Sequence, residues 1–163
     1  MNFSLTLVAA LASAILMGCA SVGELEIGQR RDAVLAKLGA PAQKIAITGG
    51  ERWTYTGGPE GHETWMLEFD AAGALVRRDQ VLTLPRIAQI AVGLKQTEVE
   101  ALIGPSKWTK RFPFLPDELV YIYRYRDDRV PMCFYVTYGA ASSVVTTGSL
   151  KEIQGSERRG PPC

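Results

Sequence analysis

Residues 27–39 read IGQRRDAVLAKLG, and residues 92–104 read VGLKQTEVEALIG. The two segments share a glycine, a valine and a second glycine at a constant offset of 65 residues: Gly28 and Gly93, Val34 and Val99, Gly39 and Gly104. In each copy the valine and the aliphatic residue four places later form one stripe of a short helix. The glycine that follows suits the left-handed conformation that ends helices. The offset therefore predicts two tandem copies of one module.

Runs of alternating apolar residues follow each helix and predict strands. In the first copy these runs are 53–55, 65–69 and 75–82, and in the second they are 119–126, 132–138 and 144–147. A short helix is also expected at 84–91, with its apolar residues buried. We expect an α+β fold in which each module, 27–84 and 85–153, packs one or two short helices on a three-stranded antiparallel sheet.

The first eighteen residues have the features of an export signal. An uncharged apolar run at 5–17 is too short to span a bilayer as a helix, and it ends at Leu16-Met17-Gly18-Cys19. This ending resembles the lipobox of bacterial lipoproteins, in which a diacylglycerol is attached to the cysteine and the chain is cut before it. We therefore expect a signal peptide at 1–18, a lipid on Cys19 and a lipidated linker at 19–26. One departure is the lack of Lys and Arg before the apolar run. By resemblance to the sorting rule for such proteins, Ala20 implies the periplasmic face of the outer membrane.

Composition argues against other classes. The formal charge is +1, and no basic face indicates a nucleic-acid partner. Beyond the signal peptide no apolar run is long enough to cross a membrane, so the lipid is the expected anchor. The segment 154–163 is rich in Gly, Pro and charge and is expected to be a flexible C-terminal tail.

No catalytic or metal-binding motif is recognisable. The one histidine, His62, lies in a Gly- and Pro-rich stretch where a solvated loop residue is expected, and no second histidine completes a zinc set. Catalytic elbows, phosphate loops and paired-carboxylate motifs do not occur. The expectation is a protein that is not an enzyme and has no metal or cofactor beyond the covalent lipid.

The chain resembles the SmpA/OmlA family of BamE-like outer-membrane lipoproteins. The resemblance rests on 28–41, Trp53-Thr54-Tyr55, Phe69-Asp70-Ala71-Ala72-Gly73 and, in the second copy, 80–83 and 87–105. It covers about 25–150 and implies assembly of β-barrel proteins into the outer membrane, with the assembly machinery as a partner. Arg30 and Lys95 depart from the Ser or Thr that often caps these helices, and 138–142 replaces the second Phe-Asp turn. Tandem modules of this shape also resemble β-lactamase inhibitor proteins.

Strand aromatics are the candidate binding residues. Half-buried strands favour aromatics for packing alone, so most of them are expected in the core. The alternation nevertheless runs on both strand faces, and exposed aromatics on an open sheet make good anchors for another protein. The candidate binding residues are Trp53, Tyr55, Tyr121, Tyr123, Tyr125 and Arg126.

Two function classes remain open. The first is a non-catalytic adaptor that binds an outer-membrane or periplasmic protein, and the second is an inhibitor or ligand-binding protein.

Two cysteines remain once Cys19 carries lipid. Cys133 lies in an expected strand and Cys163 ends the chain. Because the periplasm is oxidising, a disulfide between them is one alternative, and a free strand cysteine beside a free tail is the other.

Overall fold

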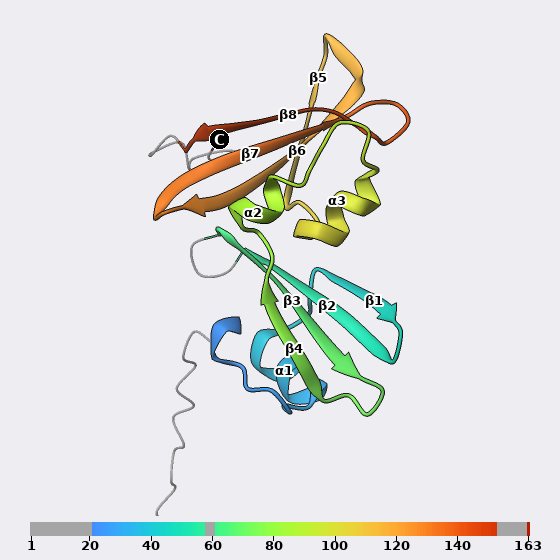
Figure 1. The fold of residues 1–163 in the computed structure, drawn as a ribbon, viewed down its shortest axis with the longest axis vertical. Helices are drawn as coiled ribbons and strands as arrows, with labels where there is room; N and C mark the ends of the chain where they lie inside the picture. Colours follow the sequence, from blue (N-terminus) through green and yellow to red (C-terminus); the bar gives the residue numbers. More distant parts are fainter. Residues whose placement is uncertain (1–20, 58–60, 153–162) are drawn as a thin grey trace, which may run out of the picture.

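The computed structural model describes residues 21–57, 61–152 and 163, and these residues form two modules stacked along the long axis (Figure 1). The fold is α+β, with two four-stranded antiparallel sheets and few helices. Within the described residues no helix has the length and apolar character needed to cross a bilayer.

The first module carries the first sheet, in the order β1-β2-β3-β4. Its elements are η1 Val22–Glu24, α1 Arg31–Leu38, β1 Gln43–Ile47, β2 Gly50–Gly57, β3 Glu63–Asp70 and β4 Leu75–Gln80. The second module carries the second sheet, in the order β5-β6-β7-β8. Its elements are α2 Leu84–Ile87, α3 Gln96–Ile103, β5 Trp108–Phe112, β6 Leu115–Asp127, β7 Val130–Tyr138 and β8 Val144–Lys151.

The expectation of three-stranded sheets was wrong, because β1 and β5 each add an edge strand. Both are five residues long, and their central residues are exposed. A strand that buries so little carries no alternating apolar pattern. Such a strand forms because its backbone pairs with β2 or β6 along its length, which only the assembled sheet provides.

The two-copy prediction is confirmed down to individual hydrogen bonds. In the first module the Gly28 amide donates to the Leu75 carbonyl at 2.7 Å, and in the second the Gly93 amide donates to the Val144 carbonyl at 2.9 Å. Val34 and Val99 are both fully buried. The helix-ending glycines, Gly39 and Gly104, have positive φ of 76° and 81°, which favours glycine. Their ψ angles of −166° and 175° are extended, so the helices do not end in the left-handed helical conformation that was expected.

The β3–β4 turn and the β7–β8 turn show how the copies differ. Gly73, at φ 79°, closes the first turn with an amide hydrogen bond to Asp70. Ser142 takes the same place in the second turn at φ 54°, a conformation uncommon for a residue with a side chain. The substitution therefore preserves the turn at the cost of local strain.

Each module has its own core beneath one face of its sheet. Leu25 belongs to the first core, so the described part of the expected 19–26 linker packs onto the first module. In the second core α2 and α3 cover the sheet through Ile87, Val99 and Ile103. The helix expected at 84–91 ends earlier, at Ile87, and Leu84 remains 44% exposed.

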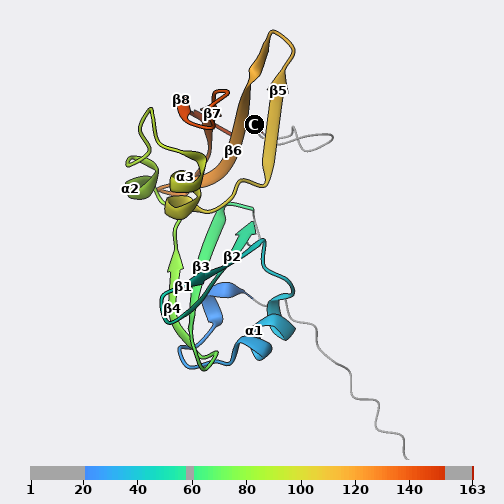
Figure 2. The ribbon, with the colours of Figure 1, turned by 90° about the vertical axis from the view of Figure 1, so that its right-hand side faces the viewer.

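The opposite face of the first sheet packs against the second module. Thr54, Thr64 and Met66 on this face are buried. The space beside Gly104 is so tight that an added Cβ would lie 2.6 Å from a methyl group of Thr64. Arg86 of α2 joins the modules through an ion pair with Asp79 of β4. One face of the first sheet therefore packs against α1 and η1, and the end of the sheet nearest the second module lies next to α2 and α3 (Figures 1 and 2).

Candidate protein-binding surfaces

Half of the binding residues expected from the sequence are core residues. Trp53 is 3% exposed and belongs to the first core, while Tyr123 and Tyr125 are 3% and 2% exposed and belong to the second. Burial raises the pKa of the Tyr123 hydroxyl far above its usual range. The proposal that Tyr123 and Tyr125 form an open interaction face was therefore wrong, because α2 and α3 cover that face of the second sheet.

Tyr55, Tyr121 and Arg126 are more accessible but have structural contacts. The Tyr55 hydroxyl donates to the Gly39 carbonyl at 3.0 Å, and partial burial raises its pKa to about 12. The Tyr121 hydroxyl accepts a 2.8 Å hydrogen bond from the Gln96 side chain and so holds α3 against the sheet. Arg126 is exposed near the β6–β7 turn. These residues are spread over both modules and do not form one surface.

The structure describes the expected disulfide but not the expected lipidation site. Cys19 lies outside the described residues. Cys133 and Cys163 form a disulfide with a Cα–Cα distance of 5.9 Å, and it closes a loop with a sequence separation of 30 residues. Cys133 lies in β7 opposite Arg124 of β6, on the face turned away from α2 and α3.

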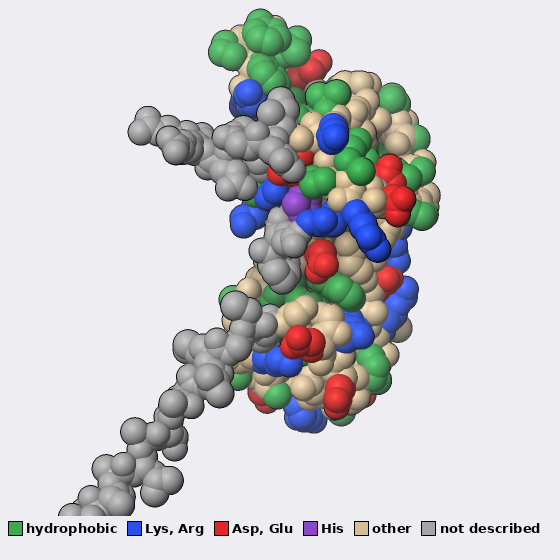
Figure 3. All heavy atoms as spheres, turned by 90° about the vertical axis from the view of Figure 1, so that its left-hand side faces the viewer, with side chains coloured by type: hydrophobic (Ala, Val, Ile, Leu, Met, Phe, Trp, Pro, Cys, Tyr) green, Lys and Arg blue, Asp and Glu red, His purple; other side chains and the backbone are tan. Residues whose placement is uncertain are grey.

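The expectation that His62 is a solvated loop residue was wrong. His62 is 5% exposed, and its Nε2 lies 2.8 Å from a carboxylate oxygen of Glu152. The same carboxylate accepts hydrogen bonds of 2.6 and 3.2 Å from Arg124. His62 comes from the β2–β3 loop of the first module, whereas Arg124 and Glu152 belong to the second. This His62–Arg124–Glu152 cluster therefore joins the modules at the side seen in Figure 3, where the histidine lies between them.

The electrostatics of Glu152 follow from these contacts. Burial by itself would raise the pKa of the carboxyl group, but hydrogen bonds from Arg124 and His62 outweigh it and hold the pKa below its usual 4.5. A carboxylate held in this way stabilises the fold at neutral pH and loses that contribution as the pH falls through the lowered pKa. The contacts of this cluster are explained by its structural role, which is to join the two modules. No catalytic role follows from its geometry.

We expect Glu152→Gln to lower the free energy of unfolding by about 3 kcal/mol, because removing one partner leaves the largely buried Arg124 charge, 14% exposed, uncompensated. Urea unfolding at pH 7 measures the difference. The variant should also lose less stability than the wild type as the pH falls below the usual carboxyl pKa of 4.5, since it lacks the carboxylate that becomes protonated as the pH falls through its lowered pKa. Glu26→Gln, at an exposed position, is the matched control. A Glu152→Gln protein as stable as this control would contradict the prediction.

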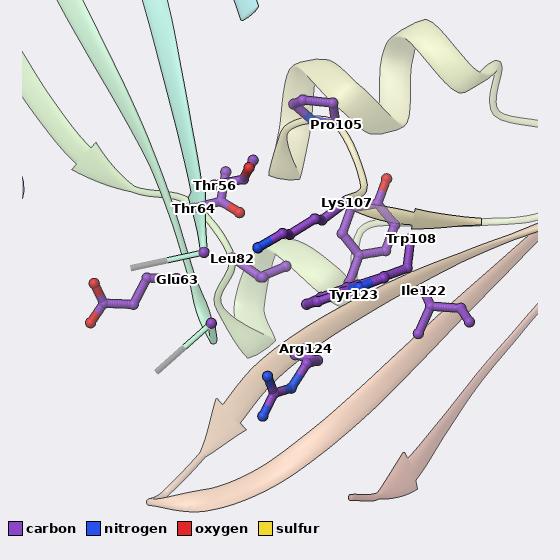
Figure 4. A pocket seen from close by; sticks show the side chains of 12 residues that line it. Thr56, Glu63, Thr64, Leu82, Pro105, Lys107, Trp108, Ile122, Tyr123 and Arg124 are labelled. Carbon is purple, nitrogen blue, oxygen red and sulfur yellow. The ribbon is translucent and has the colours of Figure 1, made fainter. Parts of the chain in front are cut away.

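A small pocket lies beside the cluster, where β2 and β3 of the first module meet the start of β5 and β6 (Figure 4). Lys107, Trp108 and Arg124 line one side of it, and Glu63 and Thr64 line the other. Its volume is only about 20 Å³. That is enough for roughly one water molecule, so this pocket is no ligand site.

The tip of the β5–β6 hairpin is an exposed apolar surface of the second module. It consists of Phe112, Pro113, Phe114 and Leu115, with Phe114 75% exposed and Leu115 39% exposed. The rings of Phe112 and Phe114 lie 5.5 Å apart, and the Lys110 ammonium lies 4.8 Å from the centre of the Phe112 ring. Green side chains gather at this tip at the top of Figure 3. The sequence pattern did not predict this exposed tip, because Pro113 breaks the alternation of apolar residues there.

A second accessible feature is the cleft between the first sheet and α3, which we call the junction cleft. Its volume is about 220 Å³. The residues that line it are Gln43, Ile45, Arg52, Thr54, Met66, Thr97, Glu100 and Ala101. Two of its charged groups have partners: Arg52 pairs with Glu68 at 2.6 Å, and Glu100 accepts from Gln96 at 2.8 Å.

Comparison with known proteins does not identify a family for this chain. No family model and no curated protein matches the chain. One similar solved structure is described as the osmotically inducible lipoprotein OsmE; it is 22% identical with a TM-score of 0.37, over 41% of this chain and 70% of that one. Another is the DUF4309 family protein YjgB from Bacillus subtilis subsp. subtilis str. 168, 16% identical with a TM-score of 0.30, over 76% and 78% of the two chains. These likenesses are too distant to assign a family.

Proposed function

We propose that this chain is a lipid-anchored, non-catalytic adaptor that binds another protein of the bacterial envelope through the tip of the β5–β6 hairpin. The observation that carries the proposal is the exposure of Phe114 on this tip. An aromatic ring left in water at the end of a hairpin gains about 1.5–3 kcal/mol when a partner buries it. Flanking prolines, Pro113 and Pro116, restrict the hairpin before binding and reduce the entropy lost on association.

Charge favours a protein over a lipid surface as the partner of the tip. Lys110 and Arg111 lie on one strand beside the tip, and Asp117 and Glu118 lie on the other. The two cations are therefore balanced by two acids, which leaves no net attraction to anionic lipid headgroups. A protein surface with an apolar pocket and charges of both signs around it complements this arrangement.

The lipobox-like Leu16-Met17-Gly18-Cys19 supports attachment to a membrane, and Ala20 supports the outer membrane. With the BamE-like resemblance of both copies, the proposal extends to the periplasmic face of the outer membrane and to β-barrel protein assembly or envelope integrity. An outer-membrane or periplasmic protein, including the barrel-assembly machinery, is the proposed partner class.

An inhibitor is the second candidate function. The same hairpin supports it, because a stiff tip with a protruding ring can enter the concave site of an enzyme. A partner that proves to be a secreted enzyme, with no envelope defect on deletion of this protein, favours the inhibitor over the adaptor.

We expect Phe114→Ala to reduce capture of the partner from solubilised outer membranes about tenfold or more, the loss typical of a central aromatic contact. The measurement is quantitative mass spectrometry of material retained by the tagged, lipidated protein. Val92→Ala removes a side chain of similar exposure, 72%, away from the tip and serves as the control. Equal capture by the two variants would rule out the hairpin tip as the binding surface.

A further inference from the structure

β1 is an edge strand of the first sheet and runs beside the junction cleft. In the sheet order β1-β2-β3-β4, only one side of β1 is paired among the described residues. An edge strand of this kind presents backbone N–H and C=O groups that another extended chain can pair with. What distinguishes this edge is the cleft of about 220 Å³ that opens next to it.

The register shows which backbone groups of β1 face outward. Ile47 and Gly50 flank the two-residue turn Thr48-Gly49, and such a pair exchanges both of its hydrogen bonds. Bonding alternates along an antiparallel ladder, so Gln43 and Ile45 also bond toward β2. The Thr54 carbonyl agrees with this assignment, because it points toward β1 and accepts from the Ala42 amide at 2.8 Å. Lys44 and Ala46 therefore direct their backbone N–H and C=O groups to the open side.

Side chains on β1 alternate between the two faces of the sheet. Ile45 and Gln43 line the junction cleft. Lys44 points to the other face, where its ammonium lies 4.1 Å from the centre of the Trp53 ring. A chain added alongside β1 would follow the same alternation and place every second side chain over the cleft.

The cleft suits one apolar side chain. Ile45, Met66 and Ala101 supply an apolar lining, to which Thr54 and Thr97 add their methyl groups. Drug-sized ligands usually occupy pockets of about 300–1,000 Å³, and this cleft is smaller. Its size and its position beside an unpaired strand therefore favour a peptide side chain over a free small molecule.

The equivalent edge in the second module is less open to pairing. The register of β5 with β6 shifts between Lys110 and Phe112. Pro113 follows β5 directly and lacks an N–H donor. Irregular pairing and proline are the means by which edge strands avoid further partners. The regular register of β1 with β2 has no such interruption.

We propose that the outer edge of β1 binds an extended segment of a partner protein by strand addition, with one apolar side chain of that segment in the junction cleft. In this mode of recognition the backbone hydrogen bonds supply affinity and the pocket for alternate side chains supplies specificity. The site is separate from the hairpin tip and does not depend on the contact proposed there.

Seven-residue peptides that alternate threonine with valine, leucine or phenylalanine are the probes. Binding to the mature full-length protein in detergent is followed by chemical shifts of backbone amides. We expect shifts concentrated in 43–47 and around Thr97, and affinity at least tenfold weaker when the peptide amides that face β1 are N-methylated. Methylation of the alternate amides should have little effect, since those amides face solvent.

Two protein variants test the two parts of the site. Ala46→Pro removes an outward N–H without removing a bond of the β1–β2 ladder, and Thr97→Phe fills the cleft from α3. Both should weaken peptide binding at least tenfold, while Thr146→Phe on exposed β8 should not. If Ala46→Pro disturbs folding, the N-methylated peptides provide the same test on the unaltered protein.

Absence of peptide binding, or equal binding of the two N-methylated series, would overturn the strand-addition proposal. Phe114→Ala should leave peptide affinity unchanged. Failure of the β1 site and failure of the hairpin-tip function are therefore distinguishable.

Discussion

Cys19→Ser is expected to abolish lipid attachment completely, because the thiol is the atom to which the diacylglycerol would be joined. Labelling with a fatty-acid analogue should fall to background, and the mass of the protein should lack the lipid. Each buried CH₂ of an acyl chain contributes about 0.8 kcal/mol to membrane binding, so the loss of the chains removes a firm anchor.

A separate variant is needed to test release from the membrane. Cys19→Ser would keep its signal peptide uncleaved, and that apolar segment could itself hold the protein to the membrane. Residues 20–163 behind a cleavable leader without a lipobox should appear in the soluble periplasmic fraction, whereas the wild type should sediment with membranes. The wild type should also sediment with outer rather than inner membranes. Persistent labelling of Cys19→Ser would show that the lipid is attached to another residue.

Loss of the Cys133–Cys163 disulfide is expected to lower the free energy of unfolding by about 3–4 kcal/mol, on the chain-entropy model for a loop of this length. The bond closes a loop with a sequence separation of 30 residues. Its effect should be seen as a lower urea midpoint in Cys163→Ser, measured at equal protein concentration. Cys163 is the better residue to replace, because Cys133 is fully buried.

Reductant provides the control for the disulfide prediction. It should destabilise the wild type and leave Cys163→Ser unchanged, since the variant has no such bond to lose. Mass spectrometry of unreduced protein from the periplasm should find neither Cys133 nor Cys163 alkylatable. Two alkylatable thiols at these positions would show that the bond is not formed in the cell.

The disulfide and the His62–Arg124–Glu152 cluster act on one region of the molecule. Arg124 and Cys133 are paired neighbours on β6 and β7, and Cys133 pairs with Leu150 of β8, two residues before Glu152. One covalent bond and one buried ionic cluster thus fasten the strand ends closest to the first module. We therefore expect their contributions to stability to be coupled, as they are for residues that share neighbours.

The sequence by itself determined the repeat and the class of the fold. Few residue types suit a tight turn, a fully buried helix position or a helix end at positive φ. These three constraints account for Gly28, Val34 and Gly39 and for their counterparts in the second copy. These constraints are local, so they can be read along the chain without knowledge of the partners. The inner strands were also predictable, since a strand buried on one face shows its alternation.

Only the tertiary structure decided which surfaces are buried and where the sheets end. Alternation showed that Tyr123 and Tyr125 share a face but not that α2 and α3 cover it. His62 is buried because the second module brings Arg124 and Glu152 to it, across a long stretch of sequence. β1 and β5 form because a neighbouring strand pairs with their backbone groups, and this pairing leaves no apolar pattern in the side chains. Burial and backbone pairing depend on what lies opposite in space, and that is set by the packing of the whole chain.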